Sequence, residues 1–165
     1  MKAIKLVLIF VLMTTLSCAQ ESPKKQATGK IGAVTITIDY GAPSVKGRTI
    51  WGELEAYDKV WRAGANDNTT ITFSKDVTIN GSDLKAGKYG FFIIPKKDGD
   101  WTVIFNTKND AWGAFSYKKE EDAMRTNSTP NFVSKVQEQL QYTIGENTIK
   151  FAWNKARLEI YVSEK

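Results

Sequence analysis

The stretch AVTITIDY (Ala33–Tyr40) decides the fold, because its large apolar residues recur at every second position. In an extended chain these even-numbered residues point to one side, while Thr35, Thr37 and Asp39 point to the other. An amphipathic helix would instead repeat its apolar residues about every 3.6 positions. The alternation therefore predicts a β-strand with one buried face and one face toward solvent.

The same two-residue period returns in the segments 69–79, 84–95, 101–106 and 136–144. The first of these breaks near Lys75–Asp76. The following Asn80–Gly81 predicts a turn, because both residues tolerate a positive φ. The segment 84–95 carries apolar residues on both faces, so we expect its strand to lie in the middle of a sheet.

The last strands and the connecting segments complete the predicted fold. Apolar residues of 149–153 are expected to face those of 158–162 across a short hairpin at Asn154–Lys155. The segment 107–116 has no regular period, and 119–125 is compatible with either a helical turn or an edge strand. About eight or nine short strands, with turn signals roughly every eight to twelve residues, predict a single all-β domain, an antiparallel β-sandwich.

Residues 1–17 have the composition of an export signal. Two lysines precede the apolar run LVLIFVLM (residues 6–13), which is too short for a spanning helix of roughly 20 residues. The signal ends in TLSC (residues 15–18), which is similar to the lipobox of bacterial lipoproteins, where the cysteine is diacylated and becomes the first mature residue. We therefore expect Cys18 to carry a lipid anchor; a plain secretory peptide is the alternative.

The predicted anchor sets the expected location of the protein. Either kind of signal exports the chain, and a lipid on Cys18 would hold it in the bacterial cell envelope, periplasm-facing or at the surface. Residues 18–30 lack apolar periodicity and are predicted to form a flexible tether, which leaves residues 31–165 for the β-sandwich domain. Removal of residues 1–17 takes away two lysines and no acid, which lowers the net charge from +5 to +3. So weak a charge does not indicate a nucleic-acid partner.

The 165-residue chain contains no histidine and a single cysteine. The lack of histidine excludes Ser-His-Asp and Cys-His catalysis and histidine-ligated metals, and a lone cysteine excludes an internal disulfide. The segments Asn66–Asn68 and Asp98–Asp100 offer oxygen ligands, but neither follows the twelve-residue calcium loop. We therefore expect no metal, no cofactor and no enzymatic activity.

The segment GRTIWGELEAYDKVWRAGANDNTTITF (Gly47–Phe73) is the least regular and most aromatic part of the predicted domain. A loop of this kind forms either the edge of a binding pocket or a packed cap on the sandwich. In a pocket, Arg62 would supply hydrogen-bond donors for a carboxylate or phosphate, and Trp51 and Trp61 would stack on a sugar ring. In a cap, both tryptophans would fill the core and Arg62 would pair with Glu53 or Asp58.

One family resemblance is centred on VWRAGANDNTTITFSKDVTINGSDLKAGKYGFFIIP (Val60–Pro95). The residues that carry it are Tyr40, Pro43, Lys46, Gly47, Arg48, Trp51, Gly52, Val60, Trp61, Arg62, Gly64, Ala65, Asn66, Thr70, Ile71, Phe73, Gly81, Leu84, Ala86, Gly87, Tyr89, Phe92, Ile94, Pro95, Trp101, Val103, Ile104 and Asn106. With these residues the chain resembles the domain of unknown function 2911 family, small exported proteins found largely in Bacteroidetes and related bacteria. Ala42 departs from the pattern, since many members carry Arg there.

The resemblance implies a compact exported domain and brings no catalytic activity with it. It marks Arg48, Trp61, Arg62 and Asn66 as family positions. At two places backbone geometry would explain the residue type: we expect Asn66 to occupy a turn with positive φ and Gly64 to permit a close backbone approach.

Three functions remain open from the sequence. The first is a non-enzymatic module that binds a saccharide or a small carboxylate. Its candidate site residues are Arg48, Trp51, Trp61, Arg62 and Asn66. The second is a protein–protein interaction or structural module of the cell envelope. The third is a carboxylate-dependent hydrolase, which would need two of Glu53, Glu55 and Asp58 to face one cleft.

Overall fold

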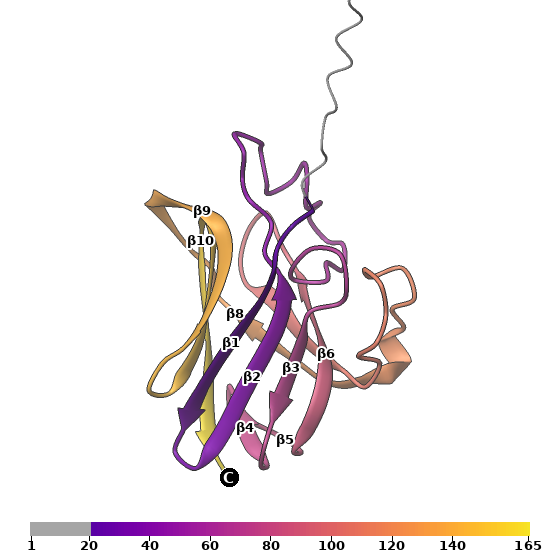
Figure 1. The fold of residues 1–165 in the computed structure, drawn as a ribbon, viewed down its shortest axis with the longest axis vertical. Coiled ribbons are helices and arrows are strands. Elements are labelled where there is room, and N and C mark those ends of the chain that lie inside the picture. Colours follow the sequence, from indigo (N-terminus) through magenta and orange to yellow (C-terminus); the bar gives the residue numbers. More distant parts are fainter. Residues whose placement is uncertain (1–20) are drawn as a thin grey trace, which may run out of the picture.

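The structure, a computed structural model, describes residues 21–165. The predicted export signal and the predicted lipidation site Cys18 lie outside these residues. The described chain forms ten strands in two antiparallel sheets that pack face to face (Figure 1). This arrangement confirms the all-β sandwich, with one or two strands more than expected.

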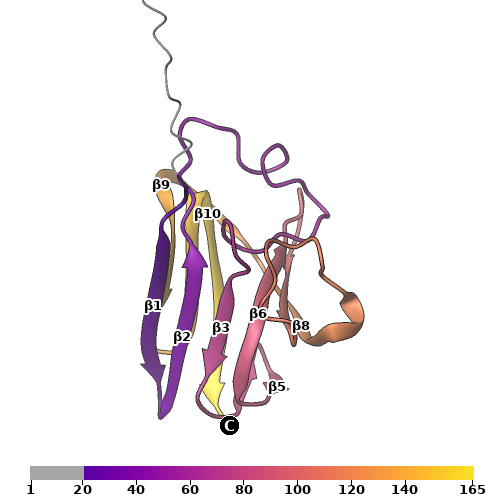
Figure 2. The same ribbon diagram turned by 45° about the vertical axis from the view of Figure 1, so that its right-hand side comes forward.

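The larger sheet has six strands in the order β1 (Lys24–Ile31), β2 (Val34–Gly41), β3 (Thr70–Phe73), β6 (Gly87–Ile94), β7 (Trp101–Asn106) and β8 (Asp122–Ser128). The smaller sheet has four strands in the order β5 (Ser82–Leu84), β4 (Val77–Ile79), β10 (Thr148–Glu164) and β9 (Asn131–Ile144). Figure 2 shows the two layers, with the long loop between β2 and β3 across one end.

The apolar alternation fixes which faces of the strands form the core. The even-numbered residues of β2 are buried, and its intervening residues are half-buried on the outer face. Strand β6 lies between β3 and β7, as its two apolar faces predict. Phe91 points into the core, while Phe92 on the opposite face is 2% exposed and packs on Tyr117, 5.1 Å away between ring centroids.

The predicted break near Lys75–Asp76 is the point where the chain passes from one sheet to the other. Strand β3 before it pairs in the large sheet, and β4 after it pairs in the small one. The predicted turn at Asn80–Gly81 joins β4 to β5 with φ values of 46° and 85°. A two-residue connection with both φ values positive suits the twist of a hairpin.

The predicted flexible tether is wrong for residues 24–30. These residues form most of β1, which pairs with β2 along its whole length at the edge of the large sheet. An edge strand exposed on its outer face needs little apolar side-chain burial, because its backbone hydrogen bonds to one neighbour hold it. The side chain of Gln26 also donates a 2.7 Å hydrogen bond to Asp39 on β2. The ordered sandwich therefore begins before residue 31.

The predicted hairpin at Asn154–Lys155 is also wrong, because β10 runs without interruption from Thr148 to Glu164. Asn154 has a φ of 50°, and the pairing with β9 shifts register on both sides of it. Such an irregularity is a β-bulge, which moves the buried residues from odd to even numbers without reversing the chain. The end of β10 then pairs with β4 instead of folding back.

The segment 119–125, for which the residues left two possibilities open, contains both. A single helical turn, η1 (Lys119–Glu121), leads directly into the edge strand β8. Within residues 21–165, no helix is long and apolar enough to cross a membrane.

Candidate functional site

The two tryptophans of the predicted site lie in the aromatic interior of the sandwich. Trp61 is 4% exposed, its indole N–H donates to the carbonyl of Gly64 at 3.1 Å, and its ring stacks on Trp153 at 5.5 Å. Trp51 is half-buried and packs against Trp101 at 4.6 Å between centroids. These contacts occupy the ring surfaces that a sugar would need, and the loop between β2 and β3 here forms a packed cap.

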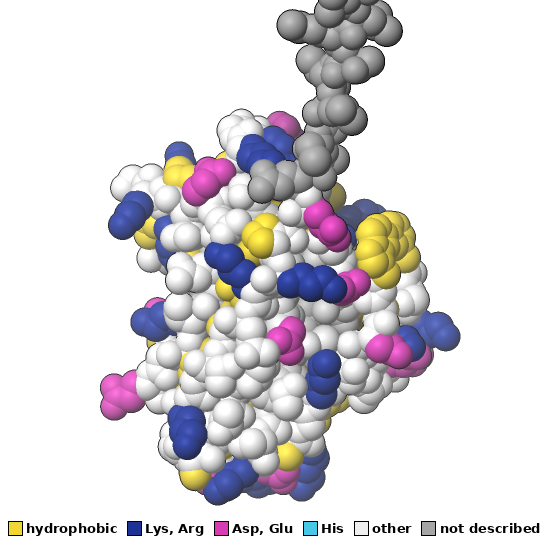
Figure 3. Space-filling view, viewed as in Figure 1, with side chains coloured by type: hydrophobic (Ala, Val, Ile, Leu, Met, Phe, Trp, Pro, Cys, Tyr) yellow, Lys and Arg dark blue, Asp and Glu magenta, His cyan; other side chains and the backbone are white. Residues whose placement is uncertain are grey.

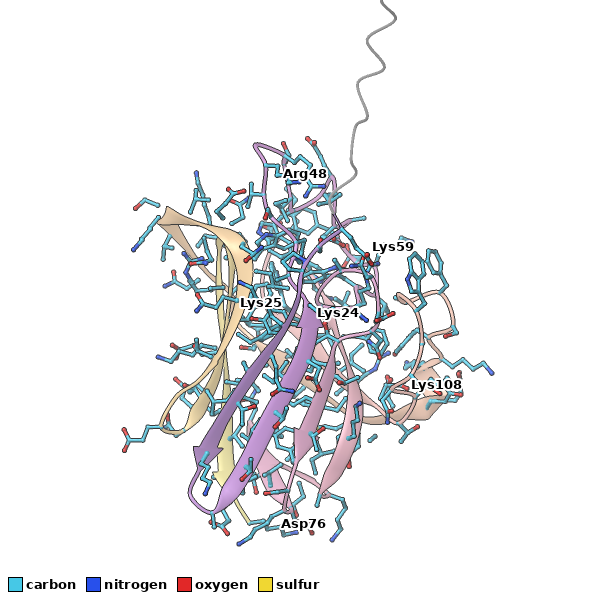
Figure 4. The ribbon with its side chains drawn as sticks, viewed as in Figure 1. Lys24, Lys25, Arg48, Lys59, Asp76 and Lys108 are labelled. Atoms are coloured by element: carbon cyan, nitrogen blue, oxygen red, sulfur yellow. The ribbon has the colours of Figure 1, made fainter. Side chains whose placement is uncertain are left out.

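The two arginines of the predicted site point to different places. Arg48 donates to the carbonyls of Val45 and Ser44 at 3.1 and 2.6 Å, beside a small pocket of about 250 Å³. Figure 4 shows it at the top of the molecule, away from Lys24 and Lys108. Arg62 instead lies beside Trp112, with its guanidinium carbon 6.0 Å from the ring centroid. The structure therefore does not bring Arg48 and Arg62 together in one pocket.

Asn66 is the predicted site residue that borders an open groove of about 660 Å³ on the outer face of the large sheet. Its φ of 63° confirms the expected turn with positive φ. The groove is lined by side chains and backbone of Lys24, Lys25, Gln26, Asp39, Tyr40, Gly41, Ala65, Asn66, Asp67, Asn68, Thr70, Lys88, Asn109, Asp110, Ala111 and Trp112.

The floor of this groove is a row of residues that face one another across neighbouring strands. Gln26 on β1 is opposite Asp39 on β2, which is opposite Thr70 on β3, and Thr70 is opposite Gly90 on β6. Because residues opposite in a sheet project to the same side, the first three present an amide, a carboxylate and a hydroxyl to the same space. The floor is therefore polar.

Two loops form the walls of the groove and are hydrogen-bonded to each other. The backbone N–H of Asn68 donates to the carbonyl of Ala111, and the N–H of Gly113 donates to that of Asn66, both at 3.0 Å. The loop after β2 and the loop after β7 thus hold each other in place. Asn66 is fixed further by its side-chain amide, which donates to the carbonyl of Ser22 at 3.2 Å.

Two glycines allow these loops to approach the sheet. A Cβ on Gly64 would lie 3.0 Å from the backbone carbonyl oxygen of Gly41, which confirms the expected close backbone approach, and 2.5 Å from the hydroxyl of Thr69. A Cβ on Gly90 would lie 2.2 Å from the carbonyl oxygen of Lys108 and 2.5 Å from Oδ1 of Asn68. These distances are below normal van der Waals contact. The loops can therefore lie this close only because residues 64 and 90 have no side chain.

An exposed aromatic pair lies at the rim of the groove, and the sequence reasoning missed it. Trp112 is 62% exposed and Phe115 is 84% exposed, and their rings are parallel within 5° at a centroid distance of 5.7 Å. The loop that carries them lies where Figure 3 shows an apolar patch at the right of the view. The signal was available, since two aromatic residues stand in the segment 107–116, which has no period that could bury them.

A polar network holds the base of the loop that carries this pair. Asp122 accepts hydrogen bonds from Nε of Arg125, the hydroxyl of Tyr117 and the side-chain amide of Asn106, at 2.5, 2.7 and 2.7 Å. Asn106 also donates to the carbonyl of Lys118 at 3.0 Å. Burial, together with the bond to Asp122, raises the pKa of Tyr117 to about 12, so this hydroxyl stays a donor at ordinary pH. The loop is therefore anchored at its end.

Two ion pairs lie at the groove. Nζ of Lys24 lies 2.7 Å from Oδ2 of Asp67, and Nζ of Lys108 lies 2.6 Å from Oδ1 of Asp110 (Figure 4 labels both lysines). The bond to Lys108 lowers the pKa of the Asp110 carboxyl. Both pairs are exposed, so each adds little stability.

The three acids considered for hydrolysis lie outside the groove. Glu53 and Asp58 are exposed and Glu55 is half-buried in the cap, where burial raises its pKa to about 7 against the opposing charges of Arg62 and Arg48. Across the described residues, no group of three or more acidic, histidine or cysteine side chains is arranged to hold a metal ion.

The fold and the groove define a class: a small two-sheet antiparallel β-sandwich with a polar groove on one sheet and an exposed aromatic pair at its rim. The chain matches the family model described as "Protein of unknown function (DUF2911)" over residues 22–162, and it belongs to that family. No curated protein and no solved structure shows a significant match to the chain.

Proposed function

We propose that this protein is an exported, lipid-anchored β-sandwich of the bacterial cell envelope that binds a small polar ligand without transforming it. The observation that carries this proposal is the groove itself. Its volume of about 660 Å³ lies in the range of about 300–1,000 Å³ found for small-molecule sites. It also combines an aromatic ring with a few convergent polar groups, as such sites do.

The residues around the groove support a saccharide or a small carboxylate as the ligand. Gln26 and Asn66 supply amides that both donate and accept hydrogen bonds, and Thr70 supplies a hydroxyl. The amide nitrogen of Asn109 already donates to the carbonyls of Lys88 and Thr107, so this residue offers its oxygen as an acceptor. The site that we propose therefore lies on the outer face of the large sheet, and not at the tryptophans of the cap as the sequence suggested. Asn66 remains in it, and Arg62 contributes indirectly through its position beside Trp112.

One observation favours a protein partner of the envelope as the second candidate. An apolar surface formed by two exposed aromatic rings is also typical of protein interfaces. The groove beside this surface is lined mainly by polar residues, which favours a hydroxyl-rich small ligand over an apolar protein surface. The position of the three acids outside the groove gives the hydrolase no comparable support.

Titration calorimetry of the mature chain from Ala19 tests the proposal, with glucose, N-acetylglucosamine, cellobiose, maltose, succinate and citrate as probes. The variant Gln26→Tyr places a bulky side chain in the groove, and Thr28→Tyr places the same side chain on the same face of β1, outside the groove lining. We expect at least one probe to bind, Gln26→Tyr to weaken binding by about 10-fold or more, and Thr28→Tyr to leave it unchanged. If no probe binds, or if both variants behave alike, the groove is not the ligand site.

A further inference from the structure

We infer that the ligand of this groove is a neutral saccharide, with one sugar ring stacked on Trp112. The inference rests on the proposed function, because it names the ligand class of the same site. It depends on three independent features of the groove: its charge balance, its hydrogen-bonding groups and its exposed aromatic ring.

The charge balance disfavours an anionic ligand. Three lysines (Lys24, Lys25 and Lys88) and three aspartates (Asp39, Asp67 and Asp110) line the groove, so the charges of its lining residues balance, and Asp110 is also paired with Lys108 beside the groove. Lys24 is already paired with Asp67. The carboxylate of Asp39 lies on the floor, where it would repel the carboxylate of a ligand. A site built for a small carboxylate would offer an arginine, whose planar group binds a carboxylate through two hydrogen bonds, and the lining of this groove contains none.

The hydrogen-bonding groups suit a ligand that carries several hydroxyls. A sugar hydroxyl both donates and accepts, so it can satisfy a carboxylate such as Asp39 and an amide such as Gln26 or Asn109 at the same time. Asn68 carries an acceptor that needs a hydrogen-bond donor. It is 6% exposed, it borders the groove, and its Oδ1 is buried with no hydrogen-bond partner among the described residues.

An unpaired buried oxygen of this kind costs about 1–3 kcal/mol. A hydroxyl donor entering the groove would reduce that cost after a small movement of the Asn68 side chain. Water and sugar hydroxyls can both do this, whereas a carboxylate cannot, because it only accepts.

The aromatic pair supplies the apolar part of the site. A pyranose ring has faces covered by C–H groups, which pack on an indole ring while the hydroxyls around the edge reach polar neighbours. Trp112 lines the groove and is 62% exposed, so a large part of its surface is in contact with solvent. The parallel ring of Phe115 at 5.7 Å and the guanidinium of Arg62 at 6.0 Å hold the indole in a defined position. The rigid base of the loop, through Asp122, adds to this.

Calorimetry of the mature chain from Ala19 tests the inference with matched probes. Cellobiose, maltose and N,N′-diacetylchitobiose are the neutral probes, and glucuronate, galacturonate and citrate are the anionic ones. The variant Trp112→Ala removes the stacking surface, and Trp112→Phe keeps a smaller one. Tyr161→Ala is the control, because Tyr161 is 56% exposed on β10 of the other sheet. Thermal melting of each variant establishes that it is folded.

We expect a neutral probe to bind, with an affinity that stays constant between about 50 and 500 mM NaCl because no net charge is involved. Trp112→Ala should weaken that binding by about 10-fold or more, Trp112→Phe by less, and Tyr161→Ala not at all. Binding of anionic probes alone, lost in Gln26→Tyr, would overturn the inference and leave the proposed function standing. Neutral binding that survives Trp112→Ala would overturn the stacking role. Failure of every probe would overturn both.

Discussion

At the scale of single residues, Glu55 is a group whose protonation is linked to folding near neutral pH. It is half-buried in the cap, and burial raises its pKa from 4.5 to about 7, although Arg62 and Arg48 act in the opposite direction. The folded protein therefore binds a proton at Glu55 more tightly than the unfolded chain does. The stability that this gives is fully present below about pH 4.5 and is lost as the pH rises through about 7.

The variant Glu55→Gln should remove this pH dependence, because glutamine is neutral at every pH. We expect the variant to be more stable than the parent at pH 8 by up to about 3 kcal/mol and to approach it near pH 5. Urea unfolding at the two pH values measures the difference, and the exposed Glu53→Gln serves as control. Parallel pH profiles for parent and Glu55→Gln would contradict the prediction.

A second prediction concerns Gly90 at the floor of the groove. The added methyl group of Gly90→Ala would meet the carbonyl oxygen of Lys108 at 2.2 Å, which forces the wall of the groove outward. We expect a loss of about 2–3 kcal/mol in the free energy of unfolding and weaker ligand binding. Gly99→Ala, whose methyl meets nothing within 4 Å, should cost only about 1 kcal/mol for its positive φ. Equal costs in urea unfolding would contradict the steric argument.

Residue types alone could not separate the tryptophans of the core from the tryptophan of the groove. Trp51 and Trp61 stand in an irregular loop, as Trp112 does, so periodicity offers no guide to their burial. The deciding factor is long-range: Trp61 and Trp51 meet Trp153 and Trp101 from strands far along the chain. Local backbone expectations were more reliable, as Asn66 and Gly64 show, because a turn or a close approach depends on few atoms.

At the scale of elements, apolar alternation predicts strands that bury one face. The prediction fails for a strand that is held mainly by backbone pairing and for a strand that a bulge interrupts. The alternation in Ala33–Tyr40 and the two apolar faces of β6 were sufficient to place both elements. Strand β1 was missed because pairing with β2 holds it, with few apolar residues to mark it. In β10 the buried apolar residues change from odd to even positions at Asn154. This change was interpreted as a hairpin, because a bulge and a turn have the same local sequence pattern.

Removal of β1 gives a test at this scale. A chain that begins at Gly32 would leave β2 as an open edge and lose Gln26 from the groove, whereas a chain that begins at Ser22 keeps both. We expect the shorter chain to melt at least about 10 °C below the longer one and to bind no ligand. Similar melting temperatures would show that residues 24–31 are only a tether after all.

At the scale of the whole molecule, the aromatic residues of the core are separate from the aromatic residue of the proposed site. Trp153 and Trp101 are fully buried between the sheets, and Trp51 and Trp61 close the end of the core over them. Trp112 lies outside this cluster, on the outer face of the large sheet. The site can therefore change without loss of the core.

We expect Trp153→Ala to reduce the free energy of unfolding by about 3–5 kcal/mol, as loss of a large buried ring does. Trp112→Ala should reduce it by less than about 1 kcal/mol, because its ring is mostly in water. Denaturant unfolding of the two variants beside the parent measures both. A large loss in Trp112→Ala would place this ring in the structural framework and weaken the case for a ligand-binding role.

The aromatic cluster also determines the intrinsic fluorescence of the protein. Four of the five tryptophans are neighbours: Trp51 lies 4.6–5.7 Å from Trp61, Trp101 and Trp153 between centroids. At these separations excitation energy passes among the four rings, and their apolar surroundings keep the emission at short wavelengths. Trp112, in water, emits at longer wavelengths and is the ring that iodide can quench. The unlabelled protein thus carries two spectrally distinct reporters: short-wavelength emission would follow unfolding, and long-wavelength emission would report the proposed ligand at Trp112.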